Sequence, residues 1–453
     1  MKTRMSTLSG DSLLKCIRNH FGLVKDHRDP SRIRIALSDF LMSGLSIFCL
    51  KFPSLLQFEE RMRKEKRASH LAPLFNLQEV PSDTHMRSVL DEVNPERLAP
   101  VFKKLFNKAQ ESKRLEAFRF LVEAYLVSVD GSQYFSSSDI CCDSCMSKTT
   151  NSDDGDVLYY HQMLAGCVVH PEQSCVIPLC PEPLRRQDGV DKNDCERAAM
   201  MRFLDRLVKD HPKLPVIIVA DALHSTSPLI RRLRLLKYGF ILGVKPGSHV
   251  KLFAGVENWA LQDKINHFTF EETIGDKVKK KRVHRFRYAN NILFNHSNLD
   301  IGVNFLEYWE TTTWVDQWGE TQEEKVHFSW VTDFKIDDKN IMQLMRGGRA
   351  RWKIENETFN TLKNQGYEFE HNFGHGKKNL STVFGYLMFL SFLFDQLSEI
   401  GCDAFRRSLR RHKRKKYLRE YLRNLFTMSY DFEFTFKSWT DFLERSVGPP
   451  APA

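Results

Sequence analysis

The chain has 453 residues, 42% of them hydrophobic, so it is long enough for two or three domains and can bury a sizeable core. Its 67 lysines and arginines exceed its 57 acidic residues, and the net charge of +10 favours an anionic partner, nucleic acid first, over a neutral or cationic one. A basic surface that serves only solubility is the alternative. The ten cysteines follow no regular framework, which favours reduced thiols over disulfides.

The start of the chain, MKTRMSTLSGDSLL, has no apolar signal-peptide core. The longest apolar stretches, residues 35–52 and 382–394, fall short of the roughly 20 residues that a membrane span needs. We therefore expect both to be buried helices of a soluble, cytoplasmic protein without a membrane span.

Residues 1–118 are predicted to form a helical N-terminal domain, because apolar residues recur there at helical spacing and SDTHMRSVLDEV carries an N-cap signal. Short basic helices can enter a DNA groove, and they are as often plain packing helices. Both interpretations stay open for this domain.

In residues 119–250 the pattern changes from helices to strands. Apolar, β-branched runs predict strands, and helical patterns alternate with the later strands, which is typical of a mixed α/β sheet flanked by helices. The predicted strands are YLVSVD, LYYHQMLAGCVV, SCVIPLC, VIIVAD and GFILGVK, and the predicted helices are DCERAAMMRFLDRLVKDH and TSPLIRRLRLLKY.

The rest of the chain divides into three segments. Alternating aromatic and β-branched residues in 251–337 predict a β-rich antiparallel insertion. Residues 338–400 turn helical again, and 401–453 form a basic helical tail that ends in the segment VGPPAPA, which we expect to be disordered.

Two predicted strands each end on a carboxylate: the run from Leu126 to Val129 on Asp130, and the run from Val216 to Ala220 on Asp221. A buried carboxylate is unfavourable unless it is paired or coordinates a cation. We therefore expect the two aspartates to lie on neighbouring strands and to share a purpose.

A third acid is expected on the helix RARWKIENETFNTLKNQGY. At about 100° per residue, Glu355 falls in the same apolar arc as Trp352 and Phe359, whereas Glu357 points to the opposite side. Glu355 is therefore the better catalytic candidate, and Arg351, one turn earlier, can pair with it or with a phosphate.

Three carboxylates on separate elements suit Mg²⁺ or Mn²⁺, and two such ions can support phosphoryl transfer. Each acid alone is more often an ordinary strand-end or helix-surface residue. Together, in a basic protein, Asp130, Asp221 and Glu355 predict a two-ion site that they ligate.

From about residue 120 to 400, the chain resembles the DDE transposases of bacterial insertion sequences. The resemblance lies in VDGSQYFSS, IIVADALHS and, most specifically, RWKIENETFNTLKNQGYEFEHNFGHGKKNL. It implies an RNase H-like core interrupted by the β-rich insertion, with 119–250 and 338–400 as its two parts. Carried over by position, the triad is Asp130, Asp221 and Glu355. Where many relatives have a tyrosine and a lysine, this chain has Gly348 and Leu362, with Lys363 next in the chain.

The resemblance implies metal-dependent cleavage at the ends of an element and strand transfer into target DNA. Arg351 and Lys363 would contact phosphate or orient the glutamate, and a homodimer would form in the complex with double-stranded DNA. An RNase H-like nuclease that never joins strands, and a catalytically silent DNA-binding derivative, are the alternatives.

The basic tail is the second predicted contact with DNA. Residues 406–423 contain ten lysines and arginines against one acid, Glu420, interleaved with tyrosines and leucines. Such a run can neutralise phosphates, although a solvated helical face is the plainer interpretation. Its density favours DNA, with the contacts assigned to Arg410, Arg411, Lys413 and Arg414.

Cys142 and Cys145 have metal-ligand spacing, and His161, Cys167 and His170 follow without a second close pair. A lone CxxC pair is a weak signal, so ordinary reduced cysteines are favoured over zinc. The later segment HNFGHGKKN fits a contact with the DNA backbone or a surface loop equally well.

Overall fold

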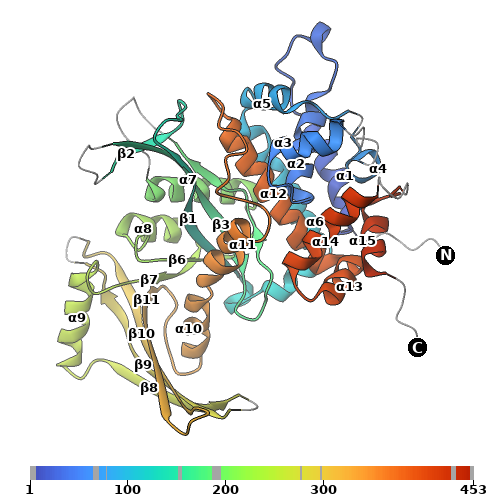
Figure 1. Cartoon of the computed structure of the whole chain (residues 1–453). Helices are drawn as coiled ribbons and strands as arrows, with labels where there is room; N and C mark the ends of the chain where they lie inside the picture. The colour runs from blue at the N-terminus through green and yellow to red at the C-terminus, as the bar shows by residue number, and fades with distance from the viewer. Residues whose placement is uncertain are drawn as a thin grey trace.

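The computed structural model describes residues 7–64, 71–77, 79–150, 156–185, 195–275, 278–295, 298–429 and 435–448. Within these ranges, an 11-stranded sheet runs in the order β2-β3-β1-β6-β7-β11-β10-β9-β8, with β4 and β5 paired to β3. Helices flank this sheet (Figure 1), so the prediction of a mixed α/β fold is confirmed.

One half of the sheet contains the predicted apolar strands. β1 pairs antiparallel with β3 and parallel with β6, and β6 pairs parallel with β7. All five residues of β6 are buried, as expected of a parallel strand covered on both faces. The strands of this half are β1 (Tyr125–Ser137), β2 (Met146–Thr149), β3 (Val157–Val169), β4 (Ile177–Pro178), β5 (Glu182–Leu184), β6 (Val216–Ala220) and β7 (Gly239–Gly243).

The predicted β-rich insertion begins with a helix, α9 (Val250–Ala260), and continues as four antiparallel strands. Its last strand pairs antiparallel with β7, where Val331 is the partner of Leu242. The insertion therefore extends the central sheet. Its strands are β8 (Asn266–Ile274), β9 (Lys280–Leu293), β10 (Gly302–Val315) and β11 (Thr321–Thr332).

Two helices cover opposite faces of β3. A Cβ on Gly166 would meet the ring of Phe203 in α7 (Glu196–Asp210), so that residue faces α7. The next residue, Cys167, places its Sγ 3.3 Å from the Thr358 hydroxyl in η7 (Ile354–Phe359). Because side chains alternate along a strand, α7 and η7 lie on different faces of the sheet.

The N-terminal segment is helical, as predicted, and packs around α12 (Leu380–Gly401), which comes from far along the chain. Among the described residues, α12 alone is long and apolar enough to cross a membrane, and 94% of its apolar window is buried inside the protein, as in a core helix. The N-terminal elements are α1 (Gly10–Phe21), η1 (Pro30–Arg32), α2 (Leu37–Cys49), α3 (Leu55–Glu59), η2 (Glu60–Lys64), α4 (Leu71–Phe75), α5 (Asp83–Asp91), η4 (Pro95–Arg97), α6 (Ala99–Glu111), η5 (Arg114–Phe118) and η6 (Leu121–Glu123).

The C-terminal helices pack beside the N-terminal ones, red beside blue in Figure 1. The backbone N–H groups of Trp439 and Thr440 donate to Asp11 of α1 at 2.7 and 3.1 Å, which joins the two ends of the chain. The remaining helices are α8 (Ser227–Leu235), α10 (Ile341–Arg349), α11 (Asn360–Asn364), α13 (Asp403–His412), α14 (Lys415–Met428) and α15 (Trp439–Val447). The predicted disorder at VGPPAPA falls almost wholly outside the described residues.

Candidate functional site

Asp130 and Asp221 occupy matching positions along two neighbouring parallel runs of the chain. Ser128 of β1 is the register partner of Val219 of β6, and each aspartate comes two residues later in the sequence. Asp221 directly follows the last residue of β6. Asp130 lies inside β1, which continues to Ser137, so the prediction that this strand ends on the aspartate was wrong. The two neighbouring parallel runs still bring the two carboxylates to matching positions, as the sequence predicted.

Arg351 links the first aspartate to the glutamate. Its Nη1 lies 2.6 Å from Glu355 Oε1 and 3.5 Å from Asp130 Oδ2. Asp221, Arg351 and Glu355 also line one cavity of about 410 Å³. The structure therefore brings together all three predicted carboxylates and the predicted arginine.

The electrostatics of the cluster favour a cation. Burial raises the pKa of Asp130 to about 6, and the neighbouring Glu355 and Asp221 carboxylates act in the same direction. The Arg351 guanidinium opposes this rise but does not cancel it. One guanidinium is thus shared among several acids, and the cluster keeps an unfavourable concentration of negative charge.

The glutamate lies in a π-helix, η7, and not in a regular α-helix. The rotation of 100° per residue used for the sequence prediction therefore does not hold there. Trp352, predicted to face the core, is 44% exposed and lines the cavity instead, so that prediction was wrong. Glu355 lines the cavity and Glu357 does not, the same order of preference as in the sequence prediction.

A fourth carboxylate near Asp130 was missed from the sequence. A Cβ on Gly131 would lie 2.6 Å from Glu196 Cδ, so the Glu196 side chain packs directly against this glycine. The buried His224, with Nε2 3.6 Å from Glu196 Oε2, holds the pKa of Glu196 below its ordinary value. His224 was visible three residues after Asp221, but the sequence offered no sign of its partner.

Lys363 lies on α11 and forms an ion pair with Glu370 at 2.7 Å. It is not among the residues that line the carboxylate cavity. Leu362, the position where relatives place a lysine, is fully buried in the core. A phosphate contact by Lys363 stays a prediction.

The basic run of the tail divides between surface and interior. The four residues assigned to DNA lie at the junction of α13 and α14 and are all exposed: Arg410, Arg411, Lys413 and Arg414. Others serve packing: Arg419 is buried beside Asp395, at 3.3 Å, and Arg423 donates to the Lys51 carbonyl at 3.0 Å. Only part of the run is therefore available to phosphates.

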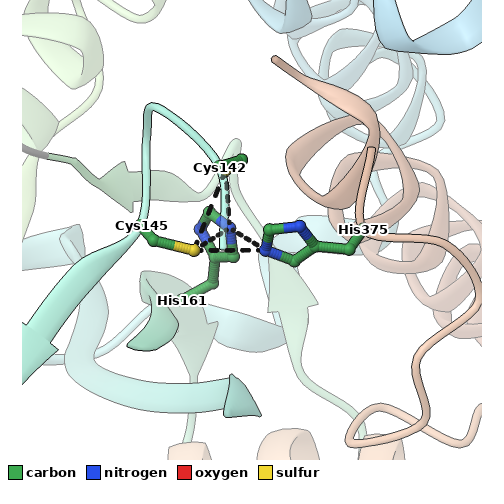
Figure 2. A group of neighbouring side chains, drawn as sticks. All are labelled: Cys142, Cys145, His161 and His375. Atoms are coloured by element: carbon green, nitrogen blue, oxygen red, sulfur yellow. Dashed lines mark hydrogen bonds between the residues drawn. The ribbon is translucent and has the colours of Figure 1, made fainter. Parts of the chain in front are cut away.

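A second cluster joins Cys142 and Cys145 to His161 of β3 and to His375 (Figure 2). The ligand atoms of all four residues lie within 4.8 Å of one another. His375 belongs to the segment HNFGHGKKN, for which a surface loop was one prediction, yet its side chain is buried. The cluster could hold a metal ion of the zinc type.

The other two residues named with this pair lie elsewhere. Cys167 contacts Thr358, and the ring of His170 packs edge-on against Phe120. Within the cluster, the hydrogen bond from Cys145 lowers the pKa of the Cys142 thiol, with help from His161, and the pKa of Cys145 is raised in turn.

A scan of the chain against protein-family models found no match, and a search against curated protein sequences found no significant match. A functional conclusion therefore depends on the geometry of these two clusters.

Proposed function

We propose that the chain is a DNA transposase of the DDE type with an RNase H-like catalytic core, acting in the cytoplasm on double-stranded DNA. The observation that carries the proposal is the meeting of Asp130, Asp221 and Glu355, from β1, the end of β6 and η7, beside one cavity.

The donor set fits Mg²⁺ or Mn²⁺. Three carboxylates from separate elements offer hard oxygen ligands. Burial raises the pKa of Asp130, Glu355 and Asp221 act in the same direction, and a bound cation would stabilise its charged form against both effects. Asp130, Asp221 and Glu355 would hold the ions. Bound there, a pair of such ions would activate an attacking oxygen and stabilise the leaving oxygen of a phosphodiester.

The chain's own residues supply orientation and charge. Arg351 holds Glu355 toward Asp130, and its other guanidinium N–H groups can donate to a phosphate oxygen. The cavity wall also carries Trp352, Phe328 and Trp330, which limit the access of water on that side. Glu196, held by His224 and Gln162, packs against Gly131, the residue that follows Asp130 in β1.

DNA would be held by the exposed basic residues of the tail. α14 packs close to the glutamate segment, because Arg419 donates to the Gln365 carbonyl at 3.2 Å, directly after α11. The net charge of +10 supports an anionic partner. A homodimer in the DNA complex is part of this proposal.

Two glutamine variants test the proposal. Glu355→Gln keeps shape but removes the charge that a divalent cation needs, so strand cleavage should fall by at least ~100-fold, which corresponds to about 2.7 kcal/mol of transition-state stabilisation. Glu357→Gln is the matched control and should keep activity within a few-fold. Both variants should bind DNA equally in a gel shift without divalent metal.

The assay uses duplexes built from the DNA that flanks the coding region, with magnesium and a target plasmid. Cleavage followed by joining supports a transposase. Cleavage without joining indicates the nuclease, and binding without either indicates the silent derivative. An inactive Glu357→Gln beside an active Glu355→Gln would show that the third ligand is misassigned.

A further inference from the structure

We propose that Cys142, Cys145, His161 and His375 bind one structural zinc ion, which fastens the segment after the glutamate helix to the β1–β3 hairpin. This inference does not rest on the proposed function, because it concerns different ligands and a different chemistry. It goes beyond the weak CxxC signal, since two histidines complete the ligand set: His161 on β3, and His375 from a distant part of the chain.

The distances between the ligand atoms fit a tetrahedron around zinc. Bonds of about 2.3 Å to sulfur and about 2.05 Å to nitrogen require edges of about 3.8 Å (S–S), about 3.6 Å (S–N) and about 3.3 Å (N–N). The two Sγ atoms lie 3.8 Å apart, and the two Nε2 atoms lie 3.1 Å apart. Three of the four S–N edges measure 3.4, 3.4 and 3.1 Å, and the fourth, between Cys142 and His375, is no longer than 4.8 Å. The other five edges lie within about 0.5 Å of the requirement.

The hydrogen bonds around the cluster orient the ligands toward a common centre. His375 Nδ1 lies 3.1 Å from the Gly376 carbonyl, so the Nδ1–H group donates a hydrogen bond to it and the Nε2 lone pair faces the sulfurs. Gly376 has φ +68, and a Cβ there would lie 2.3 Å from Asp91, so this turn requires glycine. The Cys145 N–H donates to the Cys142 carbonyl at 3.1 Å, which closes the turn between the two thiols.

Without a cation, the arrangement needs a proton between the two imidazoles. Two imidazole Nε2 atoms 3.1 Å apart repel each other unless one carries a proton or both bind a positive ion. Since His375 is positioned to keep its proton on Nδ1, its Nε2 is an acceptor. A disulfide does not explain the cluster, because the sulfurs lie 3.8 Å apart and a disulfide needs about 2.05 Å.

The site is closed, as structural zinc sites are. Cys145, His161 and His375 are buried, at 1%, 2% and 5% exposure, and four protein ligands leave no position for substrate. The ring of Phe135 packs against both imidazoles, with centroids 4.4 Å from His375 and 5.8 Å from His161. Water has little access to such a centre.

The ion would join segments that are far apart in the sequence. The cysteines follow β1, His161 lies on β3 opposite Phe135, and His375 lies between α11 and α12. Few other contacts are described between the cysteine loop and the last segment. The Asp143 N–H donates to the Lys377 carbonyl at 3.4 Å, and the Ser144 hydroxyl reaches the Lys378 carbonyl at 3.5 Å. These are long hydrogen bonds, so the ion would be the main link between the cysteine loop and the segment around His375.

Metal content of the full-length protein, purified under reducing conditions, tests the proposal. We expect about one zinc per chain by atomic emission, and its loss in Cys145→Ser and in His375→Ala. Two neighbours outside the cluster are matched controls: Cys141→Ser and His371→Ala, both at exposed positions, should keep the zinc.

A second measurement uses the unmutated chain, in case the cluster variants fail to fold. After removal of zinc with a chelator, titration with Co²⁺ should produce thiolate-to-cobalt charge-transfer and tetrahedral d–d absorption that saturate at one equivalent. Zinc absent from the purified protein together with no tetrahedral cobalt spectrum would overturn the proposal, as would full zinc content in both cluster variants. Neither readout needs DNA or magnesium, so failure of the proposed function would leave this result unaffected.

Discussion

Asp395, in the core helix α12, forms ion pairs with two buried cations. Lys51 Nζ lies 3.0 Å and Arg419 Nη2 3.3 Å from its Oδ2, and the Tyr367 hydroxyl donates to the same oxygen at 2.5 Å. The side chains of Lys51 and Arg419 are only 3% and 7% exposed. Asp395→Asn keeps the volume but leaves both cations without a counter-charge.

The expected loss follows from this burial. Removing one partner of a buried ion pair costs about 3 to 5 kcal/mol. Asparagine can still accept one hydrogen bond, and Lys51, whose pKa burial already lowers to about 8, can release its proton. Both effects favour the lower end of this energy range, so we expect a loss of about 3 kcal/mol in the free energy of unfolding.

Urea unfolding followed by tryptophan fluorescence measures this loss. Phe394, the residue before Asp395, packs against Trp439 with ring centroids 5.2 Å apart, so unfolding of this helix changes the surroundings of a tryptophan. The control is Glu399→Gln on the same helix. Glu399 pairs with Lys415 at 2.8 Å, with side-chain exposures of 14% and 22%, and its loss should cost about 1 kcal/mol or less. An Asp395→Asn loss no larger than the control would refute the reasoning.

The stability lost in Asp395→Asn should also depend on pH. Burial alone would raise the pKa of Asp395, but Lys51 and Arg419 outweigh it and hold the pKa below its ordinary value. A carboxyl with a depressed folded-state pKa contributes stability above its unfolded pKa, about 3.9, and loses it as the pH falls through the folded value. The difference between wild type and Asp395→Asn should therefore narrow below about pH 4.

Two further predictions concern DNA binding by the tail and the packing at Gly131. Replacing the four exposed tail residues with alanine should weaken duplex binding and reduce the slope of log affinity against log salt by about 3 to 4, at about 0.9 per phosphate contact. Fluorescence anisotropy at several salt concentrations measures this slope, and an unchanged slope would show that the tail is only a solvated helix. Gly131→Ala should lower the free energy of unfolding by about 1 to 3 kcal/mol, because the new Cβ would collide with the Glu196 carboxylate; an unchanged urea midpoint would contradict this packing. The tail residues concerned are Arg410, Arg411, Lys413 and Arg414.

The strands that carry the aspartates could be predicted because their signal is local. A β-branched run that ends on an acid, as at Val216 to Asp221, has the composition of a buried strand whatever lies beside it. The position of the glutamate was harder to predict. The sequence showed a helical pattern, but it did not show that Ile354–Phe359 form a π-helix, or that Trp352, just before this segment, is exposed.

The cysteine–histidine cluster could be predicted only in part, for a different reason: Cys142, Cys145 and His161 were named together from the sequence, but His375 was not. Cys145 and His375 are separated by 230 residues, and no periodicity connects them. Charge counting likewise cannot tell an exposed arginine such as Arg410 from a buried one such as Arg419, because burial depends on a partner acid elsewhere in the chain. Local patterns predict elements, whereas sites built from distant elements need the fold.

The two clusters attach the same segment to the paired strands β1 and β3 at two places. Near its start, Arg351 and Glu355 meet Asp130; near its end, His375 meets His161, the register partner of Phe135. Asp130 and Phe135 are five residues apart on one strand, about 16 Å at 3.3 Å per residue. A segment fastened at both ends of that span has little freedom to move the glutamate away from the aspartates. The zinc ligands would thus be positioning residues for the carboxylate site: in a folded His375→Ala variant, cleavage should become more dependent on magnesium concentration, whereas His371→Ala should leave that dependence unchanged.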